Sequence, residues 1–270
     1  MRTCVTYDKK GSFIQGDDTL MEIDVSVVMP AFNSEEYIEA AVKSVLTQSL
    51  TSIELIVVDD CSTDQTYFIL EKLAKLDNRI RLYKNKQNLG VAKTRNFGIS
   101  LAKGKAIALL DSDDIWETEK LSLQFQLFKQ GNKIVYCSYD FINDEGQTTK
   151  KPFIVPESTN YTKMLTSNVI SCSTILSDAK LLKDNPFSDQ YYHEDYVLWM
   201  QLIKIVKHAV GLSTILAHYR LHENSRSSKK ANAALQRWKI YREELGLSFL
   251  KTTYVFAIYA IKGIIKYYIH

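Results

Sequence analysis

The sequence feature that most constrains the fold is a short apolar run that ends in three acidic residues. Ala106 to Leu110 are all apolar, and Asp111-Ser112-Asp113-Asp114 follows directly. Such a run predicts a buried strand. Side chains two apart on a strand point the same way, so Asp111 and Asp113 are expected to project together from its end. Carboxylates gathered there favour Mg²⁺ or Mn²⁺, and a solvated acidic turn is the competing interpretation.

Strand-like and helix-like segments alternate along the first half of the chain. Strands are expected at residues 25–29, 54–58, 81–83 and 106–110, and a helix is expected after each of the first three. This alternation predicts an α/β fold with a parallel sheet and helices packed against it. Polar residues follow three of the strands, at 30–33, 59–62 and 111–114. Because ligands bind beyond the carboxyl ends of such strands, these residues predict one shared site.

Two helix starts are predicted near this site. Asn33 with Glu36 has the spacing of a capping box, and Ser62 with Gln65 has the same spacing before the next helix. Capping is also the structural alternative to a ligand-binding role for the polar residues around positions 59–62.

Several classes of protein are made improbable by the sequence. The segment after the first strand, residues 30–34, contains no glycine, which excludes a dinucleotide fingerprint there, and no Walker loop occurs. Phosphates would therefore be held by a metal and by basic side chains. The formal net charge of +3 over 270 residues gives no argument for nucleic acid as a partner.

Cysteine usage and hydropathy predict a cytoplasmic protein. The four cysteines have neither zinc-finger nor paired spacing and are interpreted as reduced thiols. The first twenty residues are polar and lack the apolar segment of a signal peptide. No stretch reaches the roughly 18 uninterrupted apolar residues that indicate a membrane span.

Four motifs resemble those of a known family, in its order and at its spacing. They are Ser26-Val27-Val28-Met29-Pro30-Ala31-Phe32-Asn33, Val57-Val58-Asp59-Asp60-Cys61-Ser62-Thr63-Asp64, Asn88-Leu89-Gly90-Val91-Ala92-Lys93-Thr94-Arg95-Asn96 and Leu110-Asp111-Ser112-Asp113-Asp114. They resemble the family-two glycosyltransferases, inverting enzymes of the GT-A fold that use nucleotide-sugar donors. The resemblance implies a Rossmann-like, mostly parallel central sheet flanked by helices. Phe32 and Cys61 stand where Tyr and a Gly or Asn are commoner, and neither change removes a charge.

The resemblance also implies roles for single residues. Pro30, Ala31, Phe32 and Asn33 would shape the nucleoside pocket. Asp60, with Asp59 beside it, would accept hydrogen bonds from the uracil edge, and Arg95 would lie near the base or the diphosphate. Asp111, Ser112 and Asp113 form the DxD-type motif of the family. Asp113 and Asp114 would hold the ribose and a Mn²⁺ or Mg²⁺ ion, in an order that the sequence leaves open.

Two further motifs lie downstream. His193-Glu194-Asp195 precedes a helix, and the resemblance implies that this acidic pair supplies the general base, for which we choose Asp195 with Glu194 as orienting partner or alternative. Helix capping is the simpler interpretation of the same residues. His222, in Tyr219-Arg220-Leu221-His222, is a candidate ligand of the metal or the diphosphate, with a purely structural role as the alternative.

Three regions are expected along the chain. Residues 1–22 form a flexible extension, residues 23–225 form the GT-A domain, and residues 226–270 form a basic, amphipathic helical region. Within the GT-A domain, residues up to about 130 would bind the nucleotide sugar and residues 131–225 the acceptor. In the last region Lys251, Lys262 and Lys266 fall on one stripe of an otherwise apolar and aromatic helix. This pattern favours a helix lying in a membrane surface, with packing on the domain or on a second subunit as the alternative.

The sequence therefore predicts a metal-dependent inverting glycosyltransferase at the inner face of the cell membrane. It would move a sugar from a UDP-sugar to a saccharide or lipid-linked oligosaccharide during synthesis of a bacterial cell-surface polysaccharide. A sugar nucleotidyltransferase is one alternative, but it would normally need a glycine-rich basic loop after the first strand. A non-catalytic nucleotide-sugar-binding scaffold is the other, and it would be expected to lose acids that this chain retains.

Overall fold

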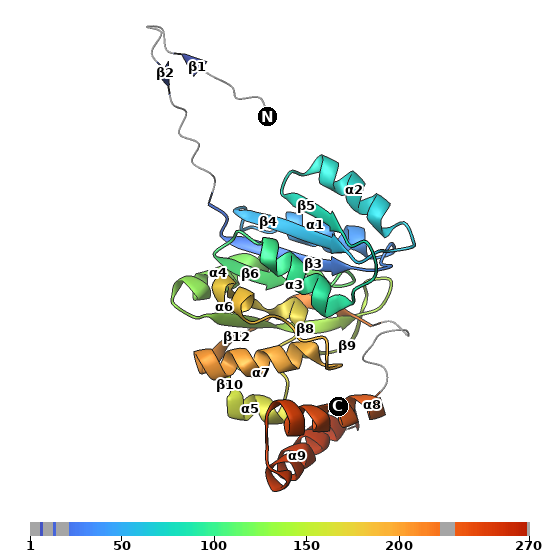
Figure 1. Ribbon diagram of the computed structural model, residues 1–270, viewed down its shortest axis with the longest axis vertical. Coiled ribbons are helices and arrows are strands. Elements are labelled where there is room, and N and C mark those ends of the chain that lie inside the picture. The colour runs from blue at the N-terminus through green and yellow to red at the C-terminus, as the bar shows by residue number, and fades with distance from the viewer. Residues whose placement is uncertain (1–5, 8–12, 15–21, 222–229, 269–270) are drawn as a thin grey trace.

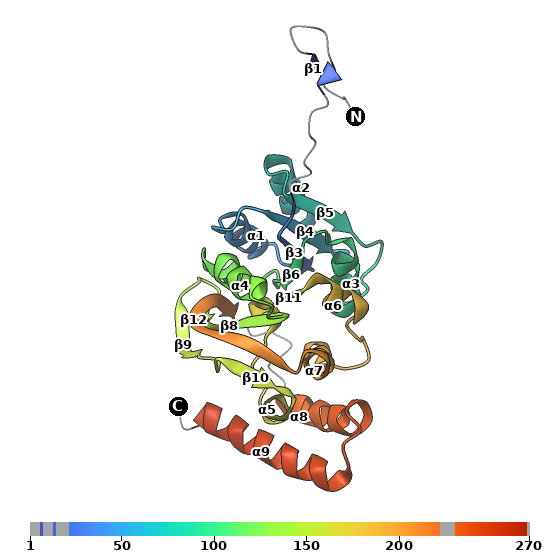
Figure 2. The ribbon, with the colours of Figure 1, turned by 90° about the vertical axis from the view of Figure 1, so that its left-hand side faces the viewer.

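A ten-stranded mixed sheet organises the structure, with helices on both faces (Figures 1 and 2). The computed structural model describes residues 6–7, 13–14, 22–221 and 230–268. Along the sheet the order is β10-β12-β8-β11-β6-β3-β4-β5, with β7 paired to β12 and β9 to β8. The strands are β3 (Val25–Ala31), β4 (Ile53–Asp59), β5 (Ile80–Lys84), β6 (Ala106–Leu109), β7 (Ile115–Trp116), β8 (Ile134–Ile142), β9 (Thr148–Phe153), β10 (Ser158–Asn160), β11 (Leu176–Asp178) and β12 (His208–Arg220). The predicted α/β fold with a central sheet is confirmed.

Strand direction gathers several chain ends at one edge of this sheet. β3 pairs in parallel with β4 and β6, and β4 pairs in parallel with β5. β11 runs antiparallel between β6 and β8, whereas β12 runs parallel to β8. The carboxyl ends of β3, β4, β6 and β12 therefore lie at the same edge, together with the start of β11.

Two apolar cores pack the helices onto the sheet. α1, α2 and α4 cover one face, and α3, α6 and α7 cover the other (Figure 2). The helices are α1 (Ile38–Leu46), α2 (Thr66–Leu76), α3 (Val91–Leu101), α4 (Lys120–Lys129), α5 (Tyr161–Thr166), α6 (Ala179–Asp184), α7 (Glu194–Val206), α8 (Lys230–Lys239) and α9 (Phe249–Tyr268). A short 3₁₀ helix, η1 (Cys172–Thr174), leads into β11, and the π-helical turn η3 (Ile240–Glu244) follows α8.

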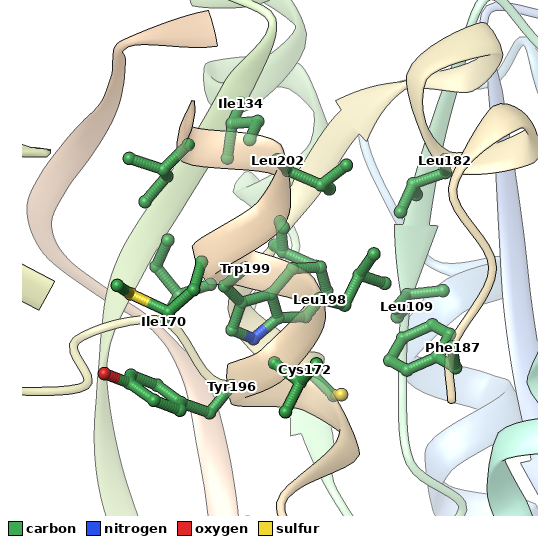
Figure 3. Close-up of a cluster of buried hydrophobic side chains, with 14 of the residues drawn as sticks. Leu109, Ile134, Ile170, Cys172, Leu182, Phe187, Tyr196, Leu198, Trp199 and Leu202 are labelled. Carbon is green, nitrogen blue, oxygen red and sulfur yellow. The ribbon is translucent and has the colours of Figure 1, made fainter. Parts of the chain in front are cut away.

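Helix α7 is anchored by a cluster of buried side chains around Trp199 (Figure 3). Trp199 is fully buried, and its ring meets that of Phe187 edge to face with centroids 5.8 Å apart. Leu198 and Leu202 are buried beside it. Burial of each such side chain contributes roughly 1.5–3 kcal/mol, so the position of the first turn of α7 is strongly fixed.

Both predicted capping boxes are wrong. α1 starts at Ile38 after Tyr37, α2 starts at Thr66 after Gln65, and neither helix has a side-chain cap. Asn33 and Ser62 instead join the two loops to each other. The Asn33 N–H donates to Ser62 Oγ over 3.0 Å, and the Thr63 N–H donates to Asn33 Oδ1 over 2.9 Å. Contacts between loops 30 residues apart thus replaced the local capping that spacing alone suggested.

The structure describes two short strands in the N-terminal extension and two helices in the C-terminal region. β1 (Thr6–Tyr7) and β2 (Phe13–Ile14) pair antiparallel, and the rest of the predicted extension up to residue 21 lies outside the described residues. At the other end α8 and α9 form a hairpin below α7, and α9 packs against α5 (Figure 2). Lys262 Nζ donates to Thr166 Oγ1 over 2.9 Å, so one face of α9 packs on the domain. Within the described part of the chain, no helix combines the length and the apolar character that crossing a membrane requires.

Gly104 provides a test of how closely the turn after α3 approaches β3. A Cβ atom at this position would lie 2.6 Å from the Ser26 nitrogen and 2.9 Å from the Val25 carbonyl carbon, both of which are backbone atoms. Gly104→Ala should therefore lower the free energy of unfolding by about 1–3 kcal/mol in urea denaturation. The neighbouring exposed substitution Lys103→Ala should change it little, and equal stability of the two variants would contradict the close packing.

Candidate active site

A cavity of about 910 Å³ opens at the edge where the strand ends meet. Its walls come from the ends of β3, β6 and β12, the start of α3, η1 and the first turn of α7. Predicted site residues that line it are Pro30, Ala31, Phe32, Asp60, Arg95, Asp111, Ser112, Asp113, Glu194 and Asp195. The structure thus brings together residues that are separated by up to 165 positions in the sequence.

Asp60 organises the loop on the β4 side of the cavity. Its Oδ1 accepts hydrogen bonds from Asn85 Nδ2 and the Leu89 N–H, and its Oδ2 accepts one from the Gly90 N–H. A carboxylate has about four acceptor positions, so roughly one remains for a ligand. Gly90 has φ = +84°, a conformation that disfavours other residues, and it leads directly into α3.

Arg95 is the buried link between the two sides of the cavity. It is 4% exposed and comes from α3. Its Nη2 donates to Asp111 Oδ1 over 2.5 Å, and its Nη1 donates to Glu194 Oε1 over 3.1 Å. Burial alone would lower the pKa of Arg95, but the charges of Asp111 and Glu194 hold it well above its ordinary value. One guanidinium therefore joins the end of β6 to the start of α7.

The three aspartates after β6 have different surroundings. Asp111 and Asp113 line the cavity, and the backbone carbonyl of Asp113 accepts a hydrogen bond from Arg220 Nε. Asp114 is 1% exposed and does not line the cavity. Its Oδ2 accepts a hydrogen bond from Ser173 Oγ, and its Oδ1 accepts one from the Arg220 N–H. Asp114 thus joins η1 to the end of β12, and its assignment to the ribose or the metal stays a prediction.

The acidic pair occupies the first turn of α7. Glu194 is buried and bound to Arg95, whereas Asp195 is partly exposed and lines the cavity. Burial raises the pKa of the Asp195 carboxyl, and the Tyr196 N–H, Arg95 and Arg237 act in the opposite direction. A carboxylate with a raised pKa in a cavity is a candidate proton acceptor.

Two other predicted site residues are placed away from the cavity lining. Asn33 has φ = +47° and uses its side chain within the loop pair described above. Asp59 is fully buried behind the cavity, where its Oδ2 accepts from the Ser62 N–H over 3.2 Å. Neither residue lines the cavity, and their roles in forming the nucleoside pocket stay predictions. His222 lies outside the described residues.

Several residues that line the cavity were not predicted from the sequence. Tyr191 and Tyr192 precede the acidic pair, Tyr219 is the last residue but one of β12, and Cys172 begins η1. Cys172 is 4% exposed, and burial raises the pKa of its thiol well above the usual value. The run Tyr191-Tyr192-His193 beside Glu194-Asp195 was the available signal for the aromatic wall. Nothing in the sequence indicated that η1 would reach the end of β6.

Comparison with known proteins decides which family this cavity belongs to. The sequence model described as Glycosyl transferase family 2 matches residues 26–182, which is more than half of the chain. The chain belongs to glycosyl transferase family 2. The matched region contains all three polar strand ends that meet at the cavity.

Relatives of this family-2 glycosyltransferase extend over most of its length. It is 37% identical over 243 residues to the putative teichuronic acid biosynthesis glycosyltransferase TuaG of Bacillus subtilis, covering 90% of this chain and 96% of TuaG. It is also 37% identical over 219 residues to WfgD of Escherichia coli, covering 80% and 84% of the two chains. WfgD is described as a UDP-Glc:alpha-D-GlcNAc-diphosphoundecaprenol beta-1,3-glucosyltransferase.

Solved structures share the fold. Staphylococcus aureus TarS in complex with UDP-GlcNAc superposes with a TM-score of 0.71 at 23% identity, covering 90% of this chain and 73% of that chain. The mannosyltransferase PcManGT of Pyrobaculum calidifontis, in complex with GDP-Man and Mn²⁺, gives a TM-score of 0.66 at 14% identity and covers 89% and 74%. The GT-A fold predicted from the motifs is confirmed.

Asp60 provides a test of the cavity wall in this glycosyltransferase. Asp60→Ala removes the acceptor of the Leu89 N–H, whereas the Gly90 N–H keeps Asn88 Oδ1 and Asn85 Nδ2 keeps Thr94 Oγ1. Amide hydrogen exchange should then become about tenfold faster or more at Leu89, because the bond that protects it is lost, and should rise less at Gly90. The exposed neighbour Lys86→Ala should leave both rates unchanged. Unaltered exchange in Asp60→Ala would show that the loop does not depend on this carboxylate.

Proposed function

We propose that this family-2 glycosyltransferase moves a sugar from a UDP-sugar to a hydroxyl of a saccharide or lipid-linked oligosaccharide, with inversion at the transferred carbon. The observation that carries this proposal is the meeting of Asp60, Asp113 and Asp195 in one cavity. A nucleoside, a leaving phosphate and an acceptor hydroxyl each have a chemically suitable group there. The described activities of TuaG and WfgD support synthesis of a bacterial cell-surface polysaccharide as the setting.

The donor would enter along the ends of β3 and β4. Pro30, Ala31 and Phe32 give this side an apolar wall, and Phe32 is 47% exposed, so its ring is accessible to a base. The remaining acceptor position of Asp60 can receive an N–H from the uracil edge. Each Nη atom of Arg95 donates to a carboxylate, so Arg95 would act on the diphosphate by orienting Asp111.

The residues at the end of β6 fit a divalent cation held jointly with a substrate. Mg²⁺ and Mn²⁺ commonly use one or two carboxylates and complete their coordination with substrate phosphates. Asp113 presents such a carboxylate in the cavity, and no group of three potential ligand side chains is found among the described residues. We therefore propose Asp113 as the protein ligand, with His222 as a second. When bound, Mn²⁺ or Mg²⁺ would neutralise charge on the leaving diphosphate.

Asp195 is the proposed general base. It would accept the proton of the acceptor hydroxyl as that oxygen attacks the sugar carbon and the bond to UDP breaks. Attack from the face opposite the leaving UDP gives inversion. Glu194 cannot easily serve in this way, because its carboxylate is buried and paired with Arg95. Its role would be to hold the first turn of α7 in register with Asp111.

A donor screen combined with one isosteric variant tests this proposal. The wild-type protein should release UDP from one UDP-sugar in the presence of Mn²⁺ and an acceptor extract. Asp195→Asn should lower transfer by about 10²–10⁴-fold while the dissociation constant of the donor stays unchanged, because only the base is lost. Undiminished transfer by Asp195→Asn would contradict the choice of base. Donor binding by the wild type without turnover in any acceptor mixture would favour a binding scaffold.

The C-terminal helix supports a location at the membrane surface. Leu250, Tyr254 and Ile261 are 81%, 69% and 57% exposed and fall within about 40° of one another around α9. Thr252 and Val255, on the opposite side, are buried against the domain. Lys251 and Lys262 are exposed beside the apolar row. We propose that this row lies in the headgroup region of an anionic membrane, which would bring the cavity to a lipid-linked acceptor.

Vesicle sedimentation tests the membrane contact. The double variant Leu250→Gln, Ile261→Gln should bind vesicles containing phosphatidylglycerol at least tenfold more weakly than the wild type, because two exposed apolar side chains are removed from the contact. Leu76→Gln is a matched control, since Leu76 is 84% exposed on α2 at the opposite end of the molecule (Figure 2). Equal vesicle binding by the double variant and the control would contradict the proposed membrane face.

A further inference from the structure

Arg237, on the C-terminal helix α8, is a buried charge that the transfer mechanism has not yet used. The residue is only 4% exposed. The guanidinium carbon lies 3.4 Å from the ring centroid of Tyr196 and 5.0 Å from that of Tyr259. Among the described residues, its Nε and Nη1 atoms have no hydrogen-bond partner. Arg237 is therefore held chiefly by two aromatic faces, one from α7 and one from α9.

Such a placement needs an electrostatic reason. A guanidinium removed from water loses several kcal/mol of hydration, and a cation–π contact returns only about 2 kcal/mol when it is desolvated. An anion nearby would offset the difference. Tyr196, on which Arg237 stacks, directly follows Asp195, and Arg237 acts to lower the pKa of Asp195. The positive charge of Arg237 thus favours the ionised form of Asp195, the proposed base.

Charged and titratable groups approach Asp195 from four other elements. Arg95 on α3 and Arg237 on α8 favour its ionised form, whereas Asp111 after β6 opposes it. The Cys172 thiol of η1 also lies within its electrostatic reach. Arg95 is already shared between Asp111 and Glu194. Arg237 is the other arginine that acts on Asp195, and it comes from outside the sheet domain.

The hydrogen bonds around Arg237 also fix the position of α7. The Tyr196 hydroxyl donates to the Met164 carbonyl over 3.1 Å, and the Tyr241 hydroxyl donates to the Leu165 carbonyl over 2.5 Å. Met164 and Leu165 belong to α5, and Tyr241 to the turn after α8. Arg237 therefore sits where α5, α7, α8 and α9 meet, directly behind the residue that follows Asp195.

We propose that Arg237 is a positioning residue for the transfer reaction: packed on Tyr196 behind the first turn of α7, it stabilises the carboxylate form of Asp195. The inference rests on the proposed role of Asp195 as general base. It makes the α8–α9 hairpin part of the catalytic machinery as well as the proposed membrane contact. A family-2 domain that ended before α8 would lack this charge.

The pH dependence of transfer tests the proposal. Loss of Arg237 removes an influence that lowers the pKa of Asp195, so the acid limb of kcat/KM in Arg237→Gln should move to higher pH by about one unit. At pH values on the acid side of this limb, transfer should be roughly tenfold slower than in the wild type. The rate should recover at alkaline pH, with donor affinity unchanged. Arg237→Lys, which retains the charge, should keep most of the wild-type profile. Lys239→Gln removes an exposed charge from the same helix and is the matched control.

A second readout does not depend on turnover. The ¹³C carboxyl resonance of Asp195, assigned by its loss in Asp195→Asn, should titrate at higher pH in Arg237→Gln than in the wild type. If Arg237→Gln does not fold, Arg237→Met, whose apolar stem can still pack on Tyr196, must show the same displacement. Superimposable titrations and pH profiles, or a loss of rate that is equal at every pH, would overturn the proposal. Absence of transfer by the wild type would instead count against the proposed function. The proposal for Arg237 would still be tested, because the titration of Asp195 can be compared in the two proteins without turnover.

Discussion

The architecture of the cavity depends on one buried guanidinium. Arg95 reaches Asp111 at the end of β6 and Glu194 at the start of α7, so one side chain joins two separate elements of the cavity wall. Because Glu194 is buried beside Arg95, loss of Arg95 would remove the counter-charge of a buried carboxylate, which typically costs about 3–5 kcal/mol. The bridge thereby sets how far the residues proposed to hold the donor phosphates stand from the proposed base.

The sheet explains why so many functional groups can meet around that bridge. Parallel β3, β4 and β6 end at one edge, and antiparallel β11 begins there, so η1 lies against the end of β6. Asp114 links these elements, because it accepts hydrogen bonds from Ser173 in η1 and from the backbone of Arg220 at the end of β12. The acidic loop is thus fixed from behind, while Asp111 and Asp113 remain on the cavity side. In the same way, Arg237 on α8 packs behind the first turn of α7, so the C-terminal helices also support the cavity from behind.

The fold and the location of the site were predictable because they depend on local patterns. Apolar runs interrupted by polar strand ends specify a parallel sheet and its ligand edge. The functions of individual carboxylates were less predictable, because they depend on distant partners: Asp114 meets Ser173, and Asp59 lies behind the cavity. The capping boxes failed for the same reason, since Asn33 and Ser62 found each other instead of their local helix ends. The buried position of Arg237 was hidden within a basic segment that resembles solvated helix surface.

A double-mutant cycle between Arg95 and Glu194 tests most directly whether the buried bridge couples the two sides of the cavity. The measured quantity is kcat/KM for sugar transfer by the wild type, Arg95→Met, Glu194→Gln and the double variant. If the bridge positions the base against the donor site, the double variant should lose little more activity than either single variant, with a coupling of at least about 1 kcal/mol, or fivefold. Effects of the two substitutions that simply multiply would show that Arg95 and Glu194 act independently and would contradict this account.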